Sequence, residues 1–341
     1  MGTHSPVIRA IDAGYGNVKF VVNPNIWSSN SCQLFPSIAL PHVHTDPCTD
    51  SMNERDTVIV QIGDEHFEVG PDVHLLEGTR ASARILHEDY TTTRQYRALI
   101  HGALLRMGVA EIDLMVVGLP VKLMADKRDR LRHSLKGRHR IGDTDVSVAD
   151  VLVLPQPLGS LIYHIKQKNL FHTITDGACL IIDQGFFTTD WLVVQGLKPM
   201  PARCSSSPTG VSALLKKIAR DLVKHTGTPF EDLYELDKGL HTGHFRLFGK
   251  PFDLSPLITS AKQVFAPLVA ELVNTVGSAG NIDRILLTGG GAGFIKDSIQ
   301  EAFPRHELTL IHDAAFANVK GFQQAGLDLL ARRKFSAKGA V

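Results

Sequence analysis

Cysteine is scarce in this chain of 341 residues, and its spacing excludes a disulfide framework. The four copies are Cys32, Cys48, Cys179 and Cys204, and no two of them form a Cys-x-x-Cys pair. His42 and His44 lie near the first two cysteines, but only the two histidines have the close spacing usual for zinc ligands. A polar surface loop is therefore the favoured interpretation of this segment, and a zinc site is the alternative.

An excess of charge of one sign is also missing, since 36 Lys and Arg face 35 Asp and Glu. A net charge of +1 excludes nucleic-acid binding through overall charge alone. No segment approaches the roughly 18–20 uninterrupted apolar residues of a membrane-spanning helix, and no signal peptide pattern begins the chain. We therefore expect a cytoplasmic protein without direct membrane contact. Its length exceeds the roughly 250–300 residues at which one core stops growing, so two domains are expected.

The apolar pattern predicts two units, each of which contains a strand, a turn and a second strand. In the first unit we predict strands at 7–11 and 18–22, a largely irregular segment at 23–55, a hairpin at 58–69, a helix at 92–107 and a strand at 114–119. In the second we predict strands at 151–154, 178–182, 191–194 and 284–288, and helices at about 155–168, 211–225, 257–276 and 314–332.

Two of the predicted turns share a composition suited to phosphate. Asp12 is followed by Gly14 and Gly16, and Asp183 is followed by Gly185 and Thr188. Glycines let backbone N–H groups approach phosphate oxygens, and a carboxylate in the same turn acts on a polyphosphate through Mg²⁺, usually by way of bound water. One such turn is an ordinary hairpin sequence. Two copies, each directly after an apolar strand, favour a phosphate site.

A third turn carries Gly289, Gly290 and Gly291 after the strand at 284–288. Three glycines between a strand and a helix leave a flat backbone surface against which a nucleoside can lie. None of the three turns matches a Walker A motif or a Gly-x-Gly-x-x-Gly dinucleotide fingerprint. This disfavours P-loop nucleotidases and Rossmann dehydrogenases.

Five segments, in order, resemble the motifs of the actin/Hsp70/sugar-kinase ATPase superfamily. Residues 11–19 and 182–190 resemble its two phosphate motifs, 287–292 its adenosine motif, and 153–159 and 318–322 its two connecting motifs. The resemblance implies an α/β, actin-like (ribonuclease H-like) duplicated two-domain fold with a nucleotide cleft between the domains. It places domain I at 1–170, with a small inserted subdomain around 30–90, domain II at 171–315, and a helix at 316–341 that returns to domain I.

The same resemblance implies roles for individual residues. Asp12 and Asp183 would hold Mg²⁺ through water, and Gln156 would orient the attacking water; these three are the expected catalytic residues. The expected nucleotide-binding residues are Gly14, Tyr15, Gly16, Asn17, Lys19, Gln184, Gly185, Thr188, Gly210, Lys216, Gly289, Gly290 and Gly291. ATP is the expected nucleotide, with GTP as the alternative.

Within the superfamily, residues 116–121 and 204–212 are similar to segments of the bacterial ParM/StbA plasmid-segregation proteins. This implies nucleotide-dependent filaments, a DNA-binding adaptor protein as partner, and a bacterial cytoplasmic location. Gln156 stands where these relatives often carry a glutamate, and Phe186-Phe187 replaces a glycine followed by a small residue. The alternatives are a non-polymerising nucleotide-binding scaffold, which Phe186-Phe187 favours, and a small-molecule kinase of the same superfamily.

Residues 122–140 hold eight Lys or Arg against two Asp, a local net charge of 8 − 2 = +6. A DNA-contacting patch is one interpretation. A solvated helix or a filament contact is favoured, because no aromatic residue is interleaved to stack on bases.

Overall fold

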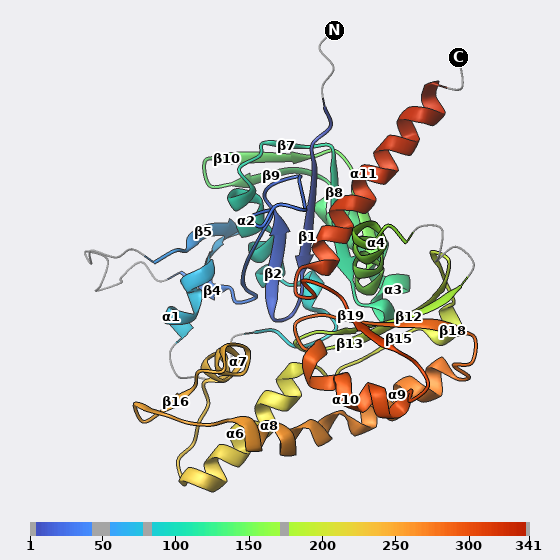
Figure 1. Ribbon diagram of the computed structural model, residues 1–341. Coiled ribbons are helices and arrows are strands. Elements are labelled where there is room, and N and C mark those ends of the chain that lie inside the picture. The colour runs from blue at the N-terminus through green and yellow to red at the C-terminus, as the bar shows by residue number, and fades with distance from the viewer. Residues whose placement is uncertain (1–4, 43–54, 78–83, 171–176, 339–341) are drawn as a thin grey trace.

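The computed structural model describes residues 5–42, 55–77, 84–170 and 177–338, which form two α/β units stacked one above the other (Figure 1). Each unit is built on a mixed sheet. The first sheet has the order β11-β8-β1-β2-β3, and the second has the order β14-β13-β12-β18-β19 with β15 paired to β13. The first comprises β1 (Ile8–Ala13), β2 (Asn17–Val21), β3 (Cys32–Pro36), β8 (Leu114–Leu119) and β11 (Val151–Pro155). The second comprises β12 (Ala178–Gln184), β13 (Thr189–Gln195), β14 (Lys198–Pro199), β15 (Ser205–Ser207), β18 (Ile282–Thr288) and β19 (Leu308–Leu310).

The two sheets repeat one topology. In each, an antiparallel hairpin (β1–β2 and β12–β13) is joined by a strand parallel to its first member (β8 and β18). The carboxyl ends of β1, β12 and β18 carry the three turns picked out in the sequence. Asp183 pairs in register with Thr288, so the second and third turns leave the second sheet side by side. The duplicated α/β architecture expected from the sequence is therefore present.

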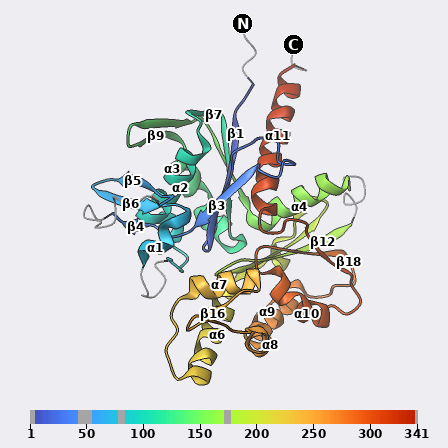
Figure 2. The same ribbon diagram turned by 60° about the vertical axis from the view of Figure 1, so that its left-hand side comes forward.

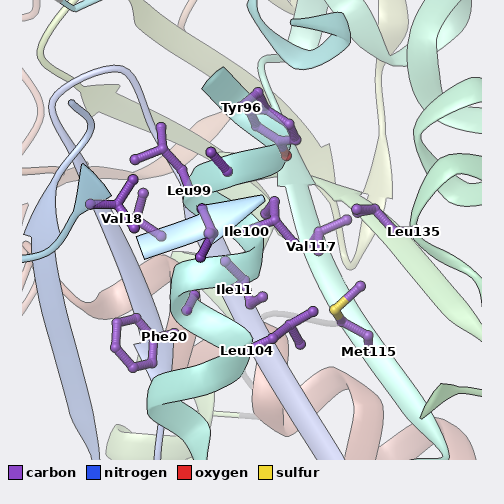
Figure 3. Packing of buried hydrophobic residues seen from close by; sticks show 14 of the residues in the cluster. Ile11, Val18, Phe20, Tyr96, Leu99, Ile100, Leu104, Met115, Val117 and Leu135 are labelled. Carbon is purple, nitrogen blue, oxygen red and sulfur yellow. The ribbon is translucent and has the colours of Figure 1, made fainter. Parts of the chain in front are cut away.

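Helix α2 (Arg94–Met107) covers one face of the first sheet. Its apolar residues recur at helical spacing, so Leu99, Ile100 and Leu104 all face the sheet and pack against Ile11 and Val117 (Figure 3). Full burial of one such side chain contributes roughly 1.5–3 kcal/mol to folding. The helix predicted at 92–107 begins after the cap residue Thr93 and ends before the left-handed Gly108.

Helix α11 (Ala317–Lys338) lies against the opposite face of the first sheet, beside α4 (Gln156–Lys168) (Figures 1 and 2). Val319 and Phe322 pack on Ile8 and Val116 in a separate apolar cluster. The contact with α4 is close enough that a Cβ at Gly321 would lie 1.7 Å from the carbonyl oxygen of Gly159. The chain after the second sheet therefore returns to the first.

Helix α4 also joins the two units. Leu161 and Ile165 are buried against Ile181 and Leu192 of the second sheet. Because α4 begins directly at the end of β11, its first residue, Gln156, stands at the boundary between the sheets.

The remaining elements are two helices of the first unit, five helices of the second unit, and small sheets at the edges. The first unit has α1 (His74–Glu77) and α3 (Met124–Leu135). The second has α6 (Val211–Thr226), α7 (Leu233–Thr242), α8 (Ser255–Ala261), α9 (Ala266–Val276) and α10 (Ala292–Ala302). The small sheets contain β4 (Leu40–Pro41), β5 (Val58–Ile62) and β6 (Glu65–Val69); β7 (Glu111–Ile112), β9 (Gly137–Ile141) and β10 (Thr144–Val148); and β16 (Arg246–Leu247) with β17 (Lys250–Pro251). In the part of the chain that the structure describes, no helix is both long and apolar enough to cross a bilayer.

The structure differs from the local predictions at three places. The segment predicted to be largely irregular also contains β3, an edge strand whose exposed Gln33 and Leu34 hide the alternation of a strand. The helix predicted at 257–276 is interrupted, because Pro267 begins a new helix after a 3₁₀ turn at Lys262–Phe265. Helix α7 was not predicted, since its Gly239 and short apolar pattern gave a weak signal.

Candidate functional site

The three turns meet in one cleft between the two sheets. Its narrow part has a volume of about 90 Å³. The expected residues that line it are Asp12, Gly14, Tyr15, Gly16, Asn17, Lys19, Gln156, Asp183, Gly185, Thr188, Gly289, Gly290 and Gly291. Asn318 also lines the cleft, so residues separated by up to 306 positions in the sequence (Asp12 to Asn318) share one site.

Three expected residues do not line the cleft. Gln184 is fully buried, and its Oε1 accepts a hydrogen bond from Thr189. Gly210 packs against the carbonyl oxygens of Gly185 and Phe186, which lets the start of α6 approach the second turn. Lys216 is exposed on α6. The α6 residue that lines the cleft is Val211, in the first turn of the helix. Lys216 is five positions further along, so its side chain lies on a different face of the helix.

Asp12 at the end of β1 is the centre of a small polar group. Its carboxylate is 2% exposed, accepts a hydrogen bond from Nε2 of Gln156 at 2.8 Å, and lies 3.9 Å from Nζ of Lys19. Lys19 faces Asp12 because the two residues are opposite each other in the β1–β2 hairpin. Gln156 uses its amide nitrogen on Asp12, so its Oε1 is left to accept from a ligand or water.

Asp183 at the end of β12 is held from the first unit. Nδ2 of Asn318, in α11, donates to its carboxylate at 2.6 Å, and Oδ1 of Asn318 lies 2.6 Å from the hydroxyl of Ser160 in α4. Burial, together with the charges of Asp190 and Asp12, raises the pKa of Asp183 to about 7. Gly289 has a φ of +87° and lies so close that a Cβ would be 2.3 Å from the Asp183 carboxylate. The third turn therefore requires glycine here.

Asp190 lines the cleft but was not among the expected site residues. It stands opposite Asp183 in the β12–β13 hairpin and is 2% exposed. It accepts from the backbone N–H of Val121 at 2.7 Å, from the hydroxyl of Thr188 at 2.9 Å, and from the hydroxyl of Ser206. One of these donors, Val121, follows β8 of the first sheet. Asp190 therefore connects the two units. The signal in the sequence was the second aspartate of the Asp-Gln-Gly-Phe-Phe-Thr-Thr-Asp segment.

Phe186 and Phe187, in the second turn, lie against the first turn. The Phe187 ring is 4.9 Å from the Tyr15 ring in an edge-to-face arrangement, and Tyr15 stacks on Tyr90 at 5.0 Å. A Cβ at Gly16 would lie 2.6 Å from Cβ of Phe186, and the Arg84 guanidinium is 4.7 Å from the Phe186 ring. The turns from the two sheets thus contact each other through these aromatic rings.

The N–H groups of the two turns differ in their availability. The amide of Gly185 donates to the carbonyl oxygen of Thr188 at 2.9 Å, within its own turn. The expectation that this amide points at phosphate is therefore not met in this conformation. The amides of Tyr15 and Gly16, at the tip of the first turn, have no acceptor among the described residues.

His241 and Asp237, both on α7, line the cleft and were missed with the helix that carries them. The ring nitrogen Nδ1 of His241 lies 3.3 Å from the Asp237 carboxylate, and Nε2 lies 3.3 Å from the carbonyl oxygen of Gly290. The hydrogen bond with Asp237 raises the pKa of His241 to about 9. His241 is therefore a cation at neutral pH, placed beside the glycine-rich third turn.

A wider cavity of about 440 Å³ continues from the narrow part. The two share Asn17, Lys19, Asp237, His241, Gly289 and Gly290, and the wider one reaches Tyr234 and Ala314. The site therefore has a small polar end at the aspartates and a larger end between α7 and the third turn.

A divalent cation fits the polar end of the cleft. Asp12, Asp183 and Asp190 are all buried there, and Lys19 is the one cation within 4.0 Å of any of them among the described residues. Burial is the main cause of the raised pKa of Asp183, and a cation beside it would favour the ionised carboxylate. The described residues contain no group of three or more His, Cys, Asp or Glu side chains arranged to hold a metal directly. This donor set suits Mg²⁺ held through water and a ligand's own oxygens.

The alternative zinc site is only partly within the described residues. His44 and Cys48 lie outside them. Nδ1 of His42 is 3.3 Å from the Glu68 carboxylate, and the thiol of Cys32 lies at the edge strand β3.

Comparison with known families matches both units. A model for the N-terminal domain of actin-like proteins matches residues 10–159, and a model for the C-terminal domain of MreB-like archaeal actin homologues matches residues 181–301. The chain has the actin-like fold. No curated protein matches the sequence.

Solved structures support this actin-like assignment over nearly the whole chain. Alp7A, an actin-like protein, has a TM-score of 0.74 at 17% identity and covers 98% of this chain and 99% of its own. A ParM from a 15-stranded filament of Clostridium botulinum has a TM-score of 0.73 at 19% identity, covering 95% and 100%. The archaeal actin homologue Ta0583 in complex with ADP has a TM-score of 0.69 at 18% identity, covering 94% and 99%.

Proposed function

We propose that this actin-like protein is a nucleoside triphosphatase that assembles into nucleotide-dependent filaments. The observation that carries the proposal is the meeting of Asp12, Gln156 and Asp183 at the boundary of the two sheets, beside three glycine-containing turns. ATP is the proposed nucleotide, with GTP as the alternative. The ADP complex of the archaeal homologue supports a nucleotide in this cleft. The proposed domains, 1–170 and 171–315 with the returning segment 316–341, place the nucleotide between them.

The proposed reaction is phosphoryl transfer to water. The amides of Tyr15 and Gly16 would bind phosphate oxygens, and Lys19 would offset their charge. Gln156, fixed by its bond to Asp12, would accept a hydrogen bond from the attacking water through Oε1. A glutamine orients water but does not remove its proton, so positioning and charge neutralisation supply most of the catalysis.

Asp12 and Asp183 would hold Mg²⁺ through bound water. The ion, when bound, would neutralise charge on the phosphate oxygens. Asn318 and Ser160 keep the Asp183 carboxylate oriented, so this site depends on α11 and α4 as well as on the strand that carries Asp183.

The nucleoside would occupy the wider cavity between α7 and the third turn. Its volume of about 440 Å³ is within the usual range for small-ligand sites. His241, as a cation beside Gly290, would lie near the nucleotide and stabilise negative charge there.

Filament formation rests on the family resemblance and on solved filaments of similar fold, including the ParM filament of Clostridium botulinum. Head-to-tail contacts that do not close on themselves produce such polymers. We further propose plasmid segregation in a bacterial cytoplasm as the cellular role, with DNA bound by a separate adaptor protein. Direct DNA contact is not proposed, because several cations of the basic segment are paired with carboxylates, including Arg132 with Asp150 and Arg138 with Asp145.

Light scattering, electron microscopy and phosphate release with ATP, GTP and ADP test this proposal together. We expect filaments and phosphate release with one triphosphate, and disassembly as the diphosphate accumulates. Protein that stays monomeric at high concentration with every nucleotide would overturn the filament proposal. If nucleotide still bound, the second candidate would replace it: a non-polymerising nucleotide-binding scaffold, which the packing of Phe186 against Gly16 favours. The kinase alternative has no residue that supports it.

A further inference from the structure

A separate cavity of about 340 Å³ lies between α2, α3 and the β5–β6 hairpin. It shares no lining residue with the cleft between the sheets or with its wider extension. Its volume is large enough for a small-molecule ligand. The proposed nucleotide site does not account for it.

The lining of this cavity is strongly cationic. Arg94, Arg97, Lys127 and Arg130 line it, and no carboxylate does. Two of the four cations have carboxylate partners: Arg94 is 3.0 Å from Glu65, and Lys127 is 2.9 Å from Asp89.

The two other cations lack such partners. Among the described residues, neither Arg97 nor Arg130 forms an ion pair. Both lie on helices packed around one opening, Arg97 on α2 and Arg130 on α3. Two unneutralised guanidinium groups at one cavity favour an anionic ligand.

Tyr96 provides a second, independent indication of a ligand. Its side chain is 3% exposed and lines the cavity, yet its hydroxyl has no hydrogen-bond partner among the described residues. Burial raises its pKa, so the hydroxyl stays protonated and available as a donor. The ring is positioned by an edge-to-face contact with Tyr90 at 5.1 Å, at the start of α2 beyond Leu99 (Figure 3).

The N-terminus of α2 lies at the same opening. The first-turn amides of Arg94 and Gln95 have no acceptor among the described residues, and Thr93 caps the amide of Tyr96. The dipole of this 14-residue helix favours negative charge at that end. The start of α2, Tyr96 and two arginines thus border one cavity.

We propose that this cavity binds a phosphate or diphosphate group of a small molecule. Arginine suits this ligand because its planar guanidinium forms paired hydrogen bonds to phosphate oxygens. An extended nucleic-acid strand fits less well. The neighbouring surface of α3 is neutralised by ion pairs such as Arg128 with Asp129, and the aromatic ring in the cavity is buried rather than exposed for base stacking.

Isothermal titration with inorganic pyrophosphate at low ionic strength tests the proposal. The proteins compared are the wild type, the double variant Arg97→Gln/Arg130→Gln, Tyr96→Phe, and the matched control Arg128→Gln. Arg128 is on the same helix as Arg130 but does not line the cavity. Any pyrophosphate that binds in the cleft between the sheets should do so equally in all four proteins. Differences in affinity among them therefore report on the cavity.

We expect affinity at least about tenfold weaker in the double variant, several-fold weaker in Tyr96→Phe, and within twofold of wild type in Arg128→Gln. Equal weakening by Arg128→Gln and the double variant would overturn the proposal, because it would indicate diffuse attraction. Unchanged binding in the double variant would overturn it as well. A mixed-sequence single-stranded oligonucleotide that bound through the same arginines more tightly than pyrophosphate would replace it with a nucleic-acid site. These outcomes do not depend on whether the protein hydrolyses a nucleotide.

Discussion

The ring of Phe187, in a turn of the second sheet, lies 4.9 Å from the ring of Tyr15, in the corresponding turn of the first sheet. Each residue follows a strand that ends at the cleft, so this edge-to-face pair connects the two units where the phosphates would lie. Tyr15 in turn stacks on Tyr90, and Tyr90 contacts Tyr96 in the cationic cavity. The turns of Tyr15 and Phe187 therefore belong to a continuous row of aromatic side chains.

Replacing Phe187 with alanine should loosen the contact between the turns. Aromatic pairs contribute about 0.5–1.5 kcal/mol beyond the area that they bury. We expect hydrogen exchange of the amides in residues 14–17 and 185–188 to accelerate about two- to tenfold in the ligand-free protein. Phe252→Leu is the control, because Phe252 pairs with Phe245 within one unit. Exchange in the turns that is the same in Phe187→Ala and wild type would contradict this role.

Asp183→Asn should lower activity without lowering stability. The substitution removes a buried carboxyl group whose pKa is raised to about 7, and it keeps an oxygen that can accept a hydrogen bond from Asn318. We expect thermal stability that is unchanged or slightly higher, and Mg²⁺-dependent phosphate release about 10–100-fold slower. Calorimetry and a phosphate-release assay check both parts. Unchanged turnover would remove Asp183 from the metal site.

The His241–Asp237 pair should make stability depend on pH. The pKa of His241 is raised from its ordinary value of 6.5 to about 9, so the folded state binds the proton more tightly than the unfolded state. Its contribution is fully present below pH 6.5 and is lost as pH rises through 9. We expect wild type to exceed His241→Gln in unfolding free energy at pH 6, with the gap closing by pH 9.5.

Urea unfolding followed by circular dichroism at several pH values measures this gap. The gap between wild type and Asp237→Asn should close with pH in the same way, because this variant removes the carboxylate that raises the pKa of His241. The side chain of His241 is 46% exposed, so solvent screens the effect and the gap should be modest. A gap that did not change between pH 6 and 9.5 would show that His241 is not held as a cation.

Gly321→Ala should destabilise the fold through the contact between α11 and α4. The added Cβ would lie 1.7 Å from the carbonyl oxygen of Gly159, so the helices must separate. Overpacking of this kind costs about 1–3 kcal/mol or more. Gly293→Ala in α10 is the matched control, since a Cβ there meets nothing within 4 Å and should stabilise that helix by roughly 0.5–1 kcal/mol. Equal unfolding midpoints for the two variants would contradict the close helix contact.

Local sequence determined the elements that carry the site. Apolar strands followed by glycine-containing turns predicted the hairpins of both units, and apolar residues at helical spacing predicted α2. These predictions succeeded because strand patterns, turn chemistry and helical spacing are decided by residues within a few positions of one another. The resemblance of five motifs to the actin/Hsp70/sugar-kinase superfamily then predicted the fold.

Only the tertiary structure decided which side chains share the cleft and what they bond to. Asn318 meets Asp183 because α11 returns to the first sheet, and Val121 meets Asp190 across the two units. His241 lies on a helix with a weak local signal, and Arg97 and Arg130 come together from helices separated in the sequence. Such contacts depend on long-range packing, in which apolar faces of distant elements are buried against each other. Local sequence patterns do not show which faces pack together. The even balance of charge excluded nucleic-acid binding through net charge. That two unpaired arginines lie around one cavity followed only from the fold.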